Sequence, residues 1–288
     1  MWKALQKTLE NSMRKRLMSS KERLDTLLVK KGIFESREKA KVYIMAGQVY
    51  VDGIKADKVG NRYNQDSEIV FRGDKMKYVS RGGYKLEKAI NYFKINLNNK
   101  ICYDIGASTG GFTDCMLQNG AKLVYSIDVG YGQFSWKLRC DSRVIAIERT
   151  NVRYMEFTDE FQKGNFASID VSFISLKKII PNLLNFLSEE GEIAALIKPQ
   201  FEAGRDKVGK KGVVRDREVH KEVVRNIVDF VLGINMEIKG LTFSPIKGPE
   251  GNIEYLIHMK KGKDLKEFNY EIIDQVIDES HKNLSLEE

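Results

Sequence analysis

Short runs of bulky apolar residues recur along most of the chain, separated by stretches whose apolar positions have helical spacing. The run at 101–105 leads directly into a glycine-rich turn, as expected where a buried strand gives way to a helix. This alternation predicts a doubly wound α/β sheet. The predicted strands are Ile101–Ile105, Leu123–Asp128, Arg143–Ile147, Phe166–Asp170, Ile193–Lys198 and Glu254–Met259.

The first quarter of the chain has a different pattern. Ser19–Glu22 matches a capping box, and the leucines after it predict a helix that reaches Gly32. Ser36 can cap a second helix, which ends at Gly47. Two strands are predicted next, Val49–Val51, which is followed by an Asp-Gly hairpin turn, and Glu68–Phe71. Together these helices and strands predict a small α+β unit.

These patterns divide the chain into five parts. We expect a basic N-terminal arm at 1–20, a small domain at 21–72, a linker at 73–80, the sheet domain at 81–264 and a helical tail at 265–288. The length of 288 residues fits one large or two modest domains.

Composition indicates an ordinary soluble globular protein, with 42% hydrophobic and 31% charged residues. No apolar run approaches the roughly 18 residues needed to span a bilayer, and the start lacks the apolar core of a secretion signal. The three cysteines are an odd number without paired spacing, which is typical of reduced residues in a cytoplasmic protein. The three histidines have no ligand spacing, so we expect no metal.

The positive charge is concentrated at one end. Residues 1–77 contain 18 Lys and Arg against 10 Asp and Glu, whereas residues 78–288 contain 30 of each. A neutral domain with a strongly basic attachment is typical of proteins that bind nucleic acid. The alternative is a basic face that is merely solvated.

The glycine-rich turn after 101–105 predicts a ligand site at the carboxyl end of that strand. No lysine follows Gly110 and Gly111, which argues against a nucleoside triphosphate, and Ser108 stands where a dinucleotide fold needs its second glycine. Asp104 in the turn favours an amine or hydroxyl, and Asp128 can accept both ribose hydroxyls of an adenosine. S-adenosylmethionine fits these groups, although a glycine-rich turn of another α/β protein is the alternative.

Polar residues end several predicted strands, and these ends share one rim of a doubly wound sheet. Lys198 is the candidate group that activates or orients a ribose 2′-hydroxyl, and Asp170 is placed to hold it. Lys85 would supply a second positive charge and Glu254 a partner for one of the lysines. Both lysines are ordinary surface or helix residues in the alternative interpretation.

The first quarter resembles the RNA-binding domain named after ribosomal small-subunit protein four. The resemblance covers about residues 21–72 and implies that Arg23, Arg37 and Lys41 grip structured RNA, where the alternative is plain surface charge. It rests on the stretch Arg23-Leu-Asp-Thr-Leu-Leu…Gly32…Ser36-Arg37…Ala40…Ile44…Gly47-Gln-Val-Tyr-Val-Asp-Gly53.

The sheet domain resembles the FtsJ-type ribose 2′-O-methyltransferases, with a Rossmann-like methyltransferase sheet. The motifs that carry this resemblance are Ser80-Arg-Gly-Gly-Tyr-Lys85-Leu, Asp104-Ile-Gly-Ala-Ser-Thr-Gly-Gly-Phe, Ser168-Ile-Asp170-Val-Ser, Lys198-Pro-Gln-Phe-Glu and Asn252-Ile-Glu254-Tyr-Leu. Ser108-Thr109 departs from the Ala-Pro that is common in that family, with little effect expected on donor binding.

With its basic domain, the chain from about 21 to 270 resembles the TlyA family. The resemblance implies methyl transfer from S-adenosylmethionine to cytidine ribose in the ribosomal RNA of ribosomal subunits. The family's catalytic tetrad falls on Lys85, Asp170, Lys198 and Glu254. The residues implied to hold the donor are Asp104, Gly106, Ala107, Ser108, Gly110, Gly111, Phe112, Asp128, Val129, Asn151 and Asp170.

A basic, glycine-rich segment at 204–215 follows Lys198 closely. We expect it to close over RNA phosphates through Lys210 and Lys211, and a plain flexible loop is the alternative.

Three other functions compete with the main prediction. A membrane-acting cytolysin is suggested by the hemolysin naming in the TlyA family, but a spanning segment is missing and the C-terminal stretch is acidic. A catalytically inactive RNA-binding protein conflicts with the intact tetrad. A small-molecule methyltransferase leaves the basic domain unexplained.

Overall fold

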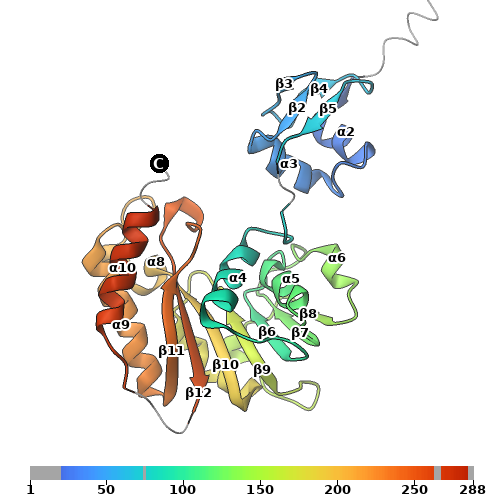
Figure 1. Cartoon of the computed structure of the whole chain (residues 1–288). Helices are drawn as coiled ribbons and strands as arrows, with labels where there is room; N and C mark the ends of the chain where they lie inside the picture. Colours follow the sequence, from blue (N-terminus) through green and yellow to red (C-terminus); the bar gives the residue numbers. More distant parts are fainter. Residues whose placement is uncertain (1–20, 74–75, 263–266, 285–288) are drawn as a thin grey trace, which may run out of the picture. The chain divides into compact units, whose positions relative to one another are not determined.

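A computed structural model describes residues 21–73, 76–262 and 267–284. The chain forms two compact units, Met1–Lys75 and Met76–Glu288, each of which is described by itself (Figure 1). The predicted basic arm at 1–20 lies outside the described residues.

The first unit packs two helices, α2 (Leu24–Lys30) and α3 (Arg37–Met45), beside a small antiparallel sheet with strand order β3-β2-β5. The strands are β2 (Val49–Val51), β3 (Ile54–Lys55) and β5 (Ile69–Phe71), while β1 (Glu22–Arg23) pairs with β4 (Arg62–Tyr63). The Asp-Gly turn between β2 and β3 is as predicted, with both residues at positive φ.

The start of the first helix differs from the prediction. Ser36 caps α3 by accepting a hydrogen bond from the Lys39 backbone N–H, as expected. The proposed capping box is wrong, because Glu22 lies in β1 and α2 begins at Leu24. Pairing of this short strand with β4 replaces the extra helical turn.

The second unit is built on a seven-stranded sheet with the order β11-β12-β10-β9-β6-β7-β8. In this order, the neighbouring strands β10, β9, β6, β7 and β8 pair in parallel. Strand β12 pairs antiparallel with both β10 and β11. Their bounds are β6 (Ile101–Ile105), β7 (Leu123–Ile127), β8 (Val144–Ile147), β9 (Gly164–Ile169), β10 (Leu187–Ile197), β11 (Met236–Phe243) and β12 (Tyr255–Lys261). This is the predicted doubly wound, Rossmann-like sheet.

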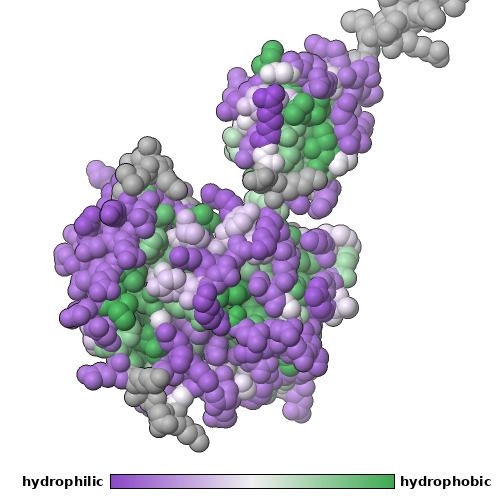
Figure 2. Space-filling view, in the orientation of Figure 1, coloured by the Kyte–Doolittle hydropathy of each residue, from purple (hydrophilic) through white to green (hydrophobic). Residues whose placement is uncertain are grey.

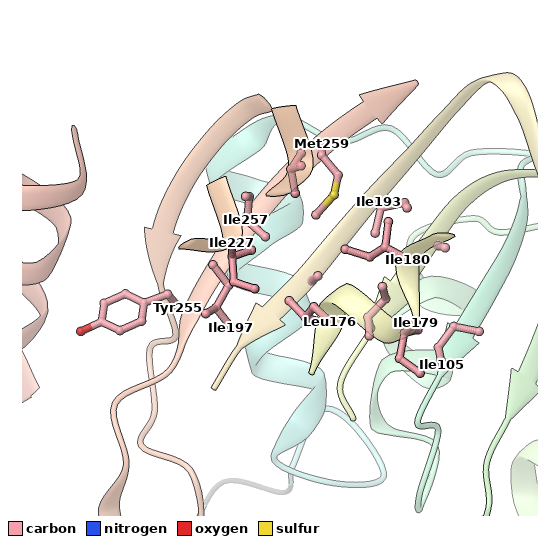
Figure 3. Packing of buried hydrophobic residues seen from close by; sticks show 14 of the residues in the cluster. Ile105, Leu176, Ile179, Ile180, Ile193, Ile197, Ile227, Tyr255, Ile257 and Met259 are labelled. Carbon is pink, nitrogen blue, oxygen red and sulfur yellow. The ribbon is translucent and has the colours of Figure 1, made fainter. Parts of the chain in front are cut away.

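Helices cover both faces of this sheet (Figure 1). On one face α4 (Gly82–Phe93), α5 (Gly111–Gln118) and α6 (Trp136–Arg139) pack against Cys102, Val124, Phe166 and Leu256. On the other face α7 (Ile180–Leu183), α9 (Arg217–Gly233) and α10 (Glu271–Leu284) enclose the larger core, where Ile227 lies near Tyr255 and Ile257 (Figure 3). The short helical turns are η1 (Val152–Tyr154), η2 (Leu176–Lys178), η3 (Leu184–Phe186), α8 (Pro199–Glu202), η4 (Arg205–Lys207) and η5 (Pro249–Gly251).

The edge strand β11 was not predicted. Its pairing with β12 shifts register between Ile238 and Gly240, and the Phe93 ring lies where a Cβ of Gly240 would be. A glycine at a register shift interrupts the alternation on which strand prediction depends.

The antiparallel strand β12 brings distant residues together. Ile197, the last residue of β10, pairs with Tyr255, the first residue of β12. Lys198 directly follows β10 and Glu254 directly precedes β12. Because the two strands are antiparallel, both residues lie at the same rim of the sheet.

Candidate active site

The turn between β6 and α5 can be made only with glycine at two positions. Gly106 has φ +86°, and a Cβ there would lie 2.4 Å from the carbonyl oxygen of Asp170. Gly110 has φ +94° and caps α5, and its Cβ would lie 2.4 Å from Cδ1 of Leu138. Both positions combine a left-handed backbone with a close approach, which L side chains tolerate poorly.

A first cavity of about 590 Å³ opens beside this turn, within the size range of small-molecule sites. It is lined by Gly106 and Ser108 of the turn, by Asp128 and Val129 after β7, and by Asn151 after β8. A rim that combines glycine backbone, the Asp128 carboxylate and apolar side chains suits the adenosine part of S-adenosylmethionine.

Asp128 has a structural task at this cavity in addition to lining it. One carboxylate oxygen accepts the Ser108 N–H at 2.7 Å, and the other accepts the Gly130 N–H at 2.6 Å. The carboxylate therefore fastens the glycine turn to the end of β7. Oδ1 also accepts a longer hydrogen bond from Gln133 Nε2 at 3.3 Å. Oδ2 retains acceptor capacity for a ribose hydroxyl, since a carboxylate oxygen can accept more than one hydrogen bond.

Asp104 differs from Asp128 in its surroundings. Its side chain is completely buried and accepts hydrogen bonds from the Thr113 hydroxyl at 2.6 Å and the Ser168 hydroxyl at 3.2 Å. It lines neither of the two cavities at the turn. Burial raises its pKa to about 7, with the two hydroxyl groups only partly offsetting the loss of water.

A second cavity of about 400 Å³ lies on the other side of the turn. Gly106, Ser108 and Asp170 line both cavities, so the two spaces meet at the turn. The second cavity adds Ala107, Gly111 and Phe112 from the predicted donor set, and Lys85 from the predicted tetrad.

The four tetrad residues form one chain of ion pairs. Lys198 Nζ lies 2.5 Å from Oδ1 of Asp170, whose Oδ2 lies 3.7 Å from Lys85 Nζ. Lys85 Nζ in turn lies 2.6 Å from Oε2 of Glu254. Lys198 directly follows β10, Asp170 directly follows β9, Lys85 lies in α4 and Glu254 directly precedes β12. The fold therefore joins four distant parts of the sequence.

The two lysines of this ion-pair chain are buried, which is unusual for lysine side chains. Lys85, Lys198 and Glu254 are each at least nine-tenths buried. Burial opposes the charged form of Lys85, but Asp170 and Glu254 outweigh it and raise the pKa of Lys85 above its usual value. Two ammonium groups and two carboxylates thus compensate one another, as buried charges must.

Several residues at the two cavities were missed by sequence reasoning. Phe173 stands at the rim of the first cavity with its side chain 90% exposed and φ +63°, a flat surface on which a nucleobase can stack. Lys247 and Gly248 line the second cavity. Phe173 follows the Ser168–Ser172 motif directly, which was an available signal, whereas Lys247 and Gly248 follow the missed strand β11.

The predicted RNA-binding residues of the first unit are arranged around a buried carboxylate. Asp25 has no exposed surface, and it accepts hydrogen bonds from the guanidinium groups of Arg23 and Arg37 at 2.8 to 3.2 Å. Although burial acts in the opposite direction, these two guanidinium groups hold the pKa of Asp25 well below its usual range. Both arginines remain partly exposed, and Lys41 lies on the same helix as Arg37 near Glu38.

The described part of the chain contains neither a candidate metal site nor a membrane-spanning helix. In residues 21–73, 76–262 and 267–284, no group of three or more His, Cys, Asp or Glu side chains is arranged to hold a metal ion. Over the same residues, no helix has the length and apolar character to cross a membrane.

Comparison with known families gives two matches that together cover most of the chain. The family model of the FtsJ-like methyltransferases matches residues 78–261. The model of the S4 domain matches residues 22–69.

The chain is also similar to whole proteins. It is 51% identical to "Putative rRNA methyltransferase YqxC" of Bacillus subtilis, over 93% of this chain and 97% of that protein. It is 37% identical to the 16S/23S rRNA (cytidine-2′-O)-methyltransferase TlyA of Mycobacterium tuberculosis, over 86% of this chain and 92% of that protein. A solved structure named "Putative hemolysin", from Streptococcus thermophilus, matches with a TM-score of 0.74 and 47% identity, over 93% of this chain and 98% of that one.

Proposed function

Because the chain belongs to the TlyA family of FtsJ-like methyltransferases, we propose that it methylates the 2′-hydroxyl of a cytidine in ribosomal RNA with S-adenosylmethionine as donor. The observation that carries the proposal is the ion-pair chain from Lys198 through Asp170 and Lys85 to Glu254. Two members of this chain line the cavities beside the glycine turn: Asp170 lines both, and Lys85 lines the second.

The turn that borders both cavities depends on Gly106 and Gly110, because a Cβ at either position would collide with Asp170 or Leu138 and distort the turn. When bound, S-adenosylmethionine supplies a methyl group on a positively charged sulfur. Asp128, Val129 and Asn151 would hold its adenosine part in the first cavity, and Gly111 and Phe112 would border its amino-acid part in the second. Asp104 would act indirectly by supporting the turn.

Methyl transfer to a ribose hydroxyl needs an oriented oxygen that loses its proton as the new bond forms. Lys198 would donate a hydrogen bond to the 2′-oxygen and stabilise the negative charge that develops there. Asp170 fixes the position of the Lys198 ammonium. As the 2′-hydroxyl gives its proton to Lys198 Nζ, Lys198 would pass one of its own protons to the Asp170 carboxylate, so Lys198 stays charged and Asp170 ends protonated. Lys85 adds a second positive charge, which Glu254 balances.

RNA recognition would be shared between the two units. The arginine pair Arg23 and Arg37, with Lys41, offers positive charge to the phosphate backbone from the first unit. Lys210 and Lys211 do so from the second. The domain limits we propose are 21–72 for RNA binding and 81–264 for methyl transfer, with a linker at 73–80, an arm at 1–20 and a helical tail at 265–288. An enzyme that modifies ribosomal RNA works where ribosomes are made, so we place it in the cytoplasm.

A membrane-lytic function has less support. The apolar side of α10 is already used, since Ile273, Val276 and Ile277 are buried in the core of the second unit. On the face in Figure 2, hydrophobic residues form separate patches between hydrophilic ones. A helix whose apolar side is packed has no free face to place in a bilayer.

The test is transfer of labelled methyl from S-adenosylmethionine to unmodified ribosomal subunits, followed by mapping of the RNA for resistance to alkaline cleavage. A 2′-O-methyl group blocks cleavage at its own nucleotide, so we expect label at a protected cytidine. Subunits already methylated at that site are the matched control and should accept no label. If the protein binds the donor but labels neither the subunits nor free ribosomal RNA, the proposed activity is wrong. Leakage from dye-loaded liposomes, measured in parallel, would instead favour the lytic function.

A further inference from the structure

The basic segment after Lys198 is a closed turn. The Gly212 N–H donates to the Gly209 carbonyl at 2.8 Å, and the Gly209 N–H donates to the Val213 carbonyl at 3.1 Å. Lys210 and Lys211 lie exposed at its tip. Within the described part of the chain neither ammonium has an ion-pair partner, so both are available for an anion.

The base of this turn is fixed by one side chain from a distant segment. Asn252 is 2% exposed, and its Oδ1 accepts the Val214 N–H at 3.1 Å while its Nδ2 donates to the Gly212 carbonyl at 2.9 Å. Val213 and Val214 are buried beside these bonds. Replacement of this amide would leave the buried Val214 N–H without its hydrogen bond and would release the Gly212 carbonyl from Asn252.

Asn252 is also part of the segment that holds Glu254. Its own carbonyl accepts the Gly248 N–H at 2.8 Å, and the Glu254 carbonyl accepts the Ser244 N–H at 2.8 Å. Two residues along the chain from Asn252, Glu254 receives its 2.6 Å hydrogen bond from Lys85.

A second connection reaches Tyr255, the residue that follows Glu254. His220 contacts the Val214 carbonyl at 2.9 Å through Nε2 and the Tyr255 hydroxyl at 2.6 Å through Nδ1. The base of the basic turn is therefore connected to the residues on both sides of Glu254.

From these contacts we propose that Asn252 is a positioning residue that sets the basic turn at a fixed place relative to the tetrad. RNA phosphates bound by Lys210 and Lys211 would then bring the target ribose to Lys198. The inference rests on the proposed function and assigns the turn a defined ligand, the phosphate backbone near the target nucleotide. In this proposal the segment binds RNA phosphates as a turn whose base is held by hydrogen bonds, and not as a loop that moves to close over them.

The test is a double-mutant cycle between Asn252→Ser and the pair Lys210→Gln with Lys211→Gln. Measured quantities are the donor Kd, kcat and KM for the RNA substrate, and the dependence of KM on salt. Asn252→Ser shortens the side chain without adding charge, and Asn252→Asp, which retains the size and one acceptor, is the second variant. Asn119→Asp is the matched control, because its Nδ2 donates to the Cys115 carbonyl at 2.8 Å far from the turn.

For the double lysine variant we expect a tenfold or larger rise in KM, and a slope of log KM against log salt that is lower by about 1.5, as expected for two lost phosphate contacts. Asn252→Ser should lower that slope as well. In the Asn252→Ser background, the two lysine substitutions should raise KM for the RNA by less than a further threefold. The donor Kd should stay within twofold in every variant.

Full additivity of the two changes, or an unchanged salt slope in both Asn252 variants, would overturn the inference. A wild-type protein without any RNA methylation would instead refute the proposed function, so the two failures are distinguishable. A loss of donor binding in both Asn252 variants would also count against a positioning role.

Discussion

Gly248 and Glu254 are in such close contact that no side chain fits between them. A Cβ on residue 248 would lie 2.2 Å from Oε1 of Glu254, well inside contact distance. The backbone of Gly248 has φ −66°, which any residue can adopt, so glycine is required here for space alone. The wall of the second cavity thus lies directly against the buried carboxylate that balances Lys85.

Gly248→Ala should therefore impair methyl transfer without affecting donor binding. The added methyl group must displace the Glu254 carboxylate, which weakens its hydrogen bond to Lys85, and we expect a fall in kcat of tenfold or more. Single-turnover methyl transfer and calorimetric donor binding measure the two effects separately. Gly233→Ala is the control, since a Cβ there meets nothing within 4 Å. Equal activity of the two variants would show that Glu254 has room to move without consequence.

Lys198→Ala should retain the donor and lose transfer. Removal of the ammonium leaves Asp170 paired with Lys85 alone and leaves the 2′-oxygen without its proposed partner. A group that assists proton transfer contributes typically 10²–10⁴-fold, which is the expected loss in kcat. The exposed Lys122→Ala is the control. Turnover within threefold of the wild type would exclude Lys198 from the reaction.

Gly106→Ala should abolish donor binding. The new Cβ would collide with the Asp170 carbonyl in a left-handed backbone, so the turn must open and the cradle is lost. Gly32→Ala is a matched control for backbone strain, because it has φ +68° but nothing within 4 Å of its Cβ. We expect the donor Kd to rise at least tenfold in the first variant and to stay unchanged in the second. A normal Kd in Gly106→Ala would mean that the donor binds away from this turn.

Asp104 should make stability depend on pH. Its pKa is about 7 in the folded protein against about 3.9 in an unfolded chain. Between these values the unfolded state has released a proton that the folded state retains. The free energy of unfolding therefore falls as pH rises from about 4 to 7, by up to about 1.4 kcal/mol per pH unit from this group.

Urea denaturation of the wild type and Asp104→Asn at several pH values measures this contribution. The unfolding free energy of Asp104→Asn minus that of the wild type should increase as pH rises to 7 and should then become constant. Asp159→Asn, at an exposed position, should show no such trend. A pH-independent difference for Asp104→Asn would indicate that Asp104 is ionised throughout.

The parallel half of the sheet was predictable because its strands are rich in apolar residues and several are followed directly by a polar residue. The same pattern placed Asp170 and Lys198 at one rim. Strand β11 escaped prediction because Gly240 and a register shift break its alternation. Without β11, the segment before Glu254 had no visible anchor, and Lys247 and Gly248 were not recognised as part of the cavity wall.

The orientation of a side chain was harder to predict than its position along the chain. Asp104 and Asp128 both lie at strand ends, yet Asp104 turns towards the hydroxyl of Thr113 and Asp128 towards the cavity. The α5 helix decides this difference, because Thr113 reaches back to β6 only after the helix has packed. Likewise, the positive residues Arg23 and Arg37 gave no indication that a buried Asp25 holds them both.

The place of β12 in the sheet has a consequence for protein synthesis. The glycine turn leaves the ribosome long before β12, which inserts between β10 and β11 and brings Glu254 with it. A chain that terminates before Glu254 would retain the turn and Lys85 but would lack the carboxylate that balances this buried ammonium. Premature termination late in the message therefore removes the reaction centre while leaving most of the donor-binding framework encoded.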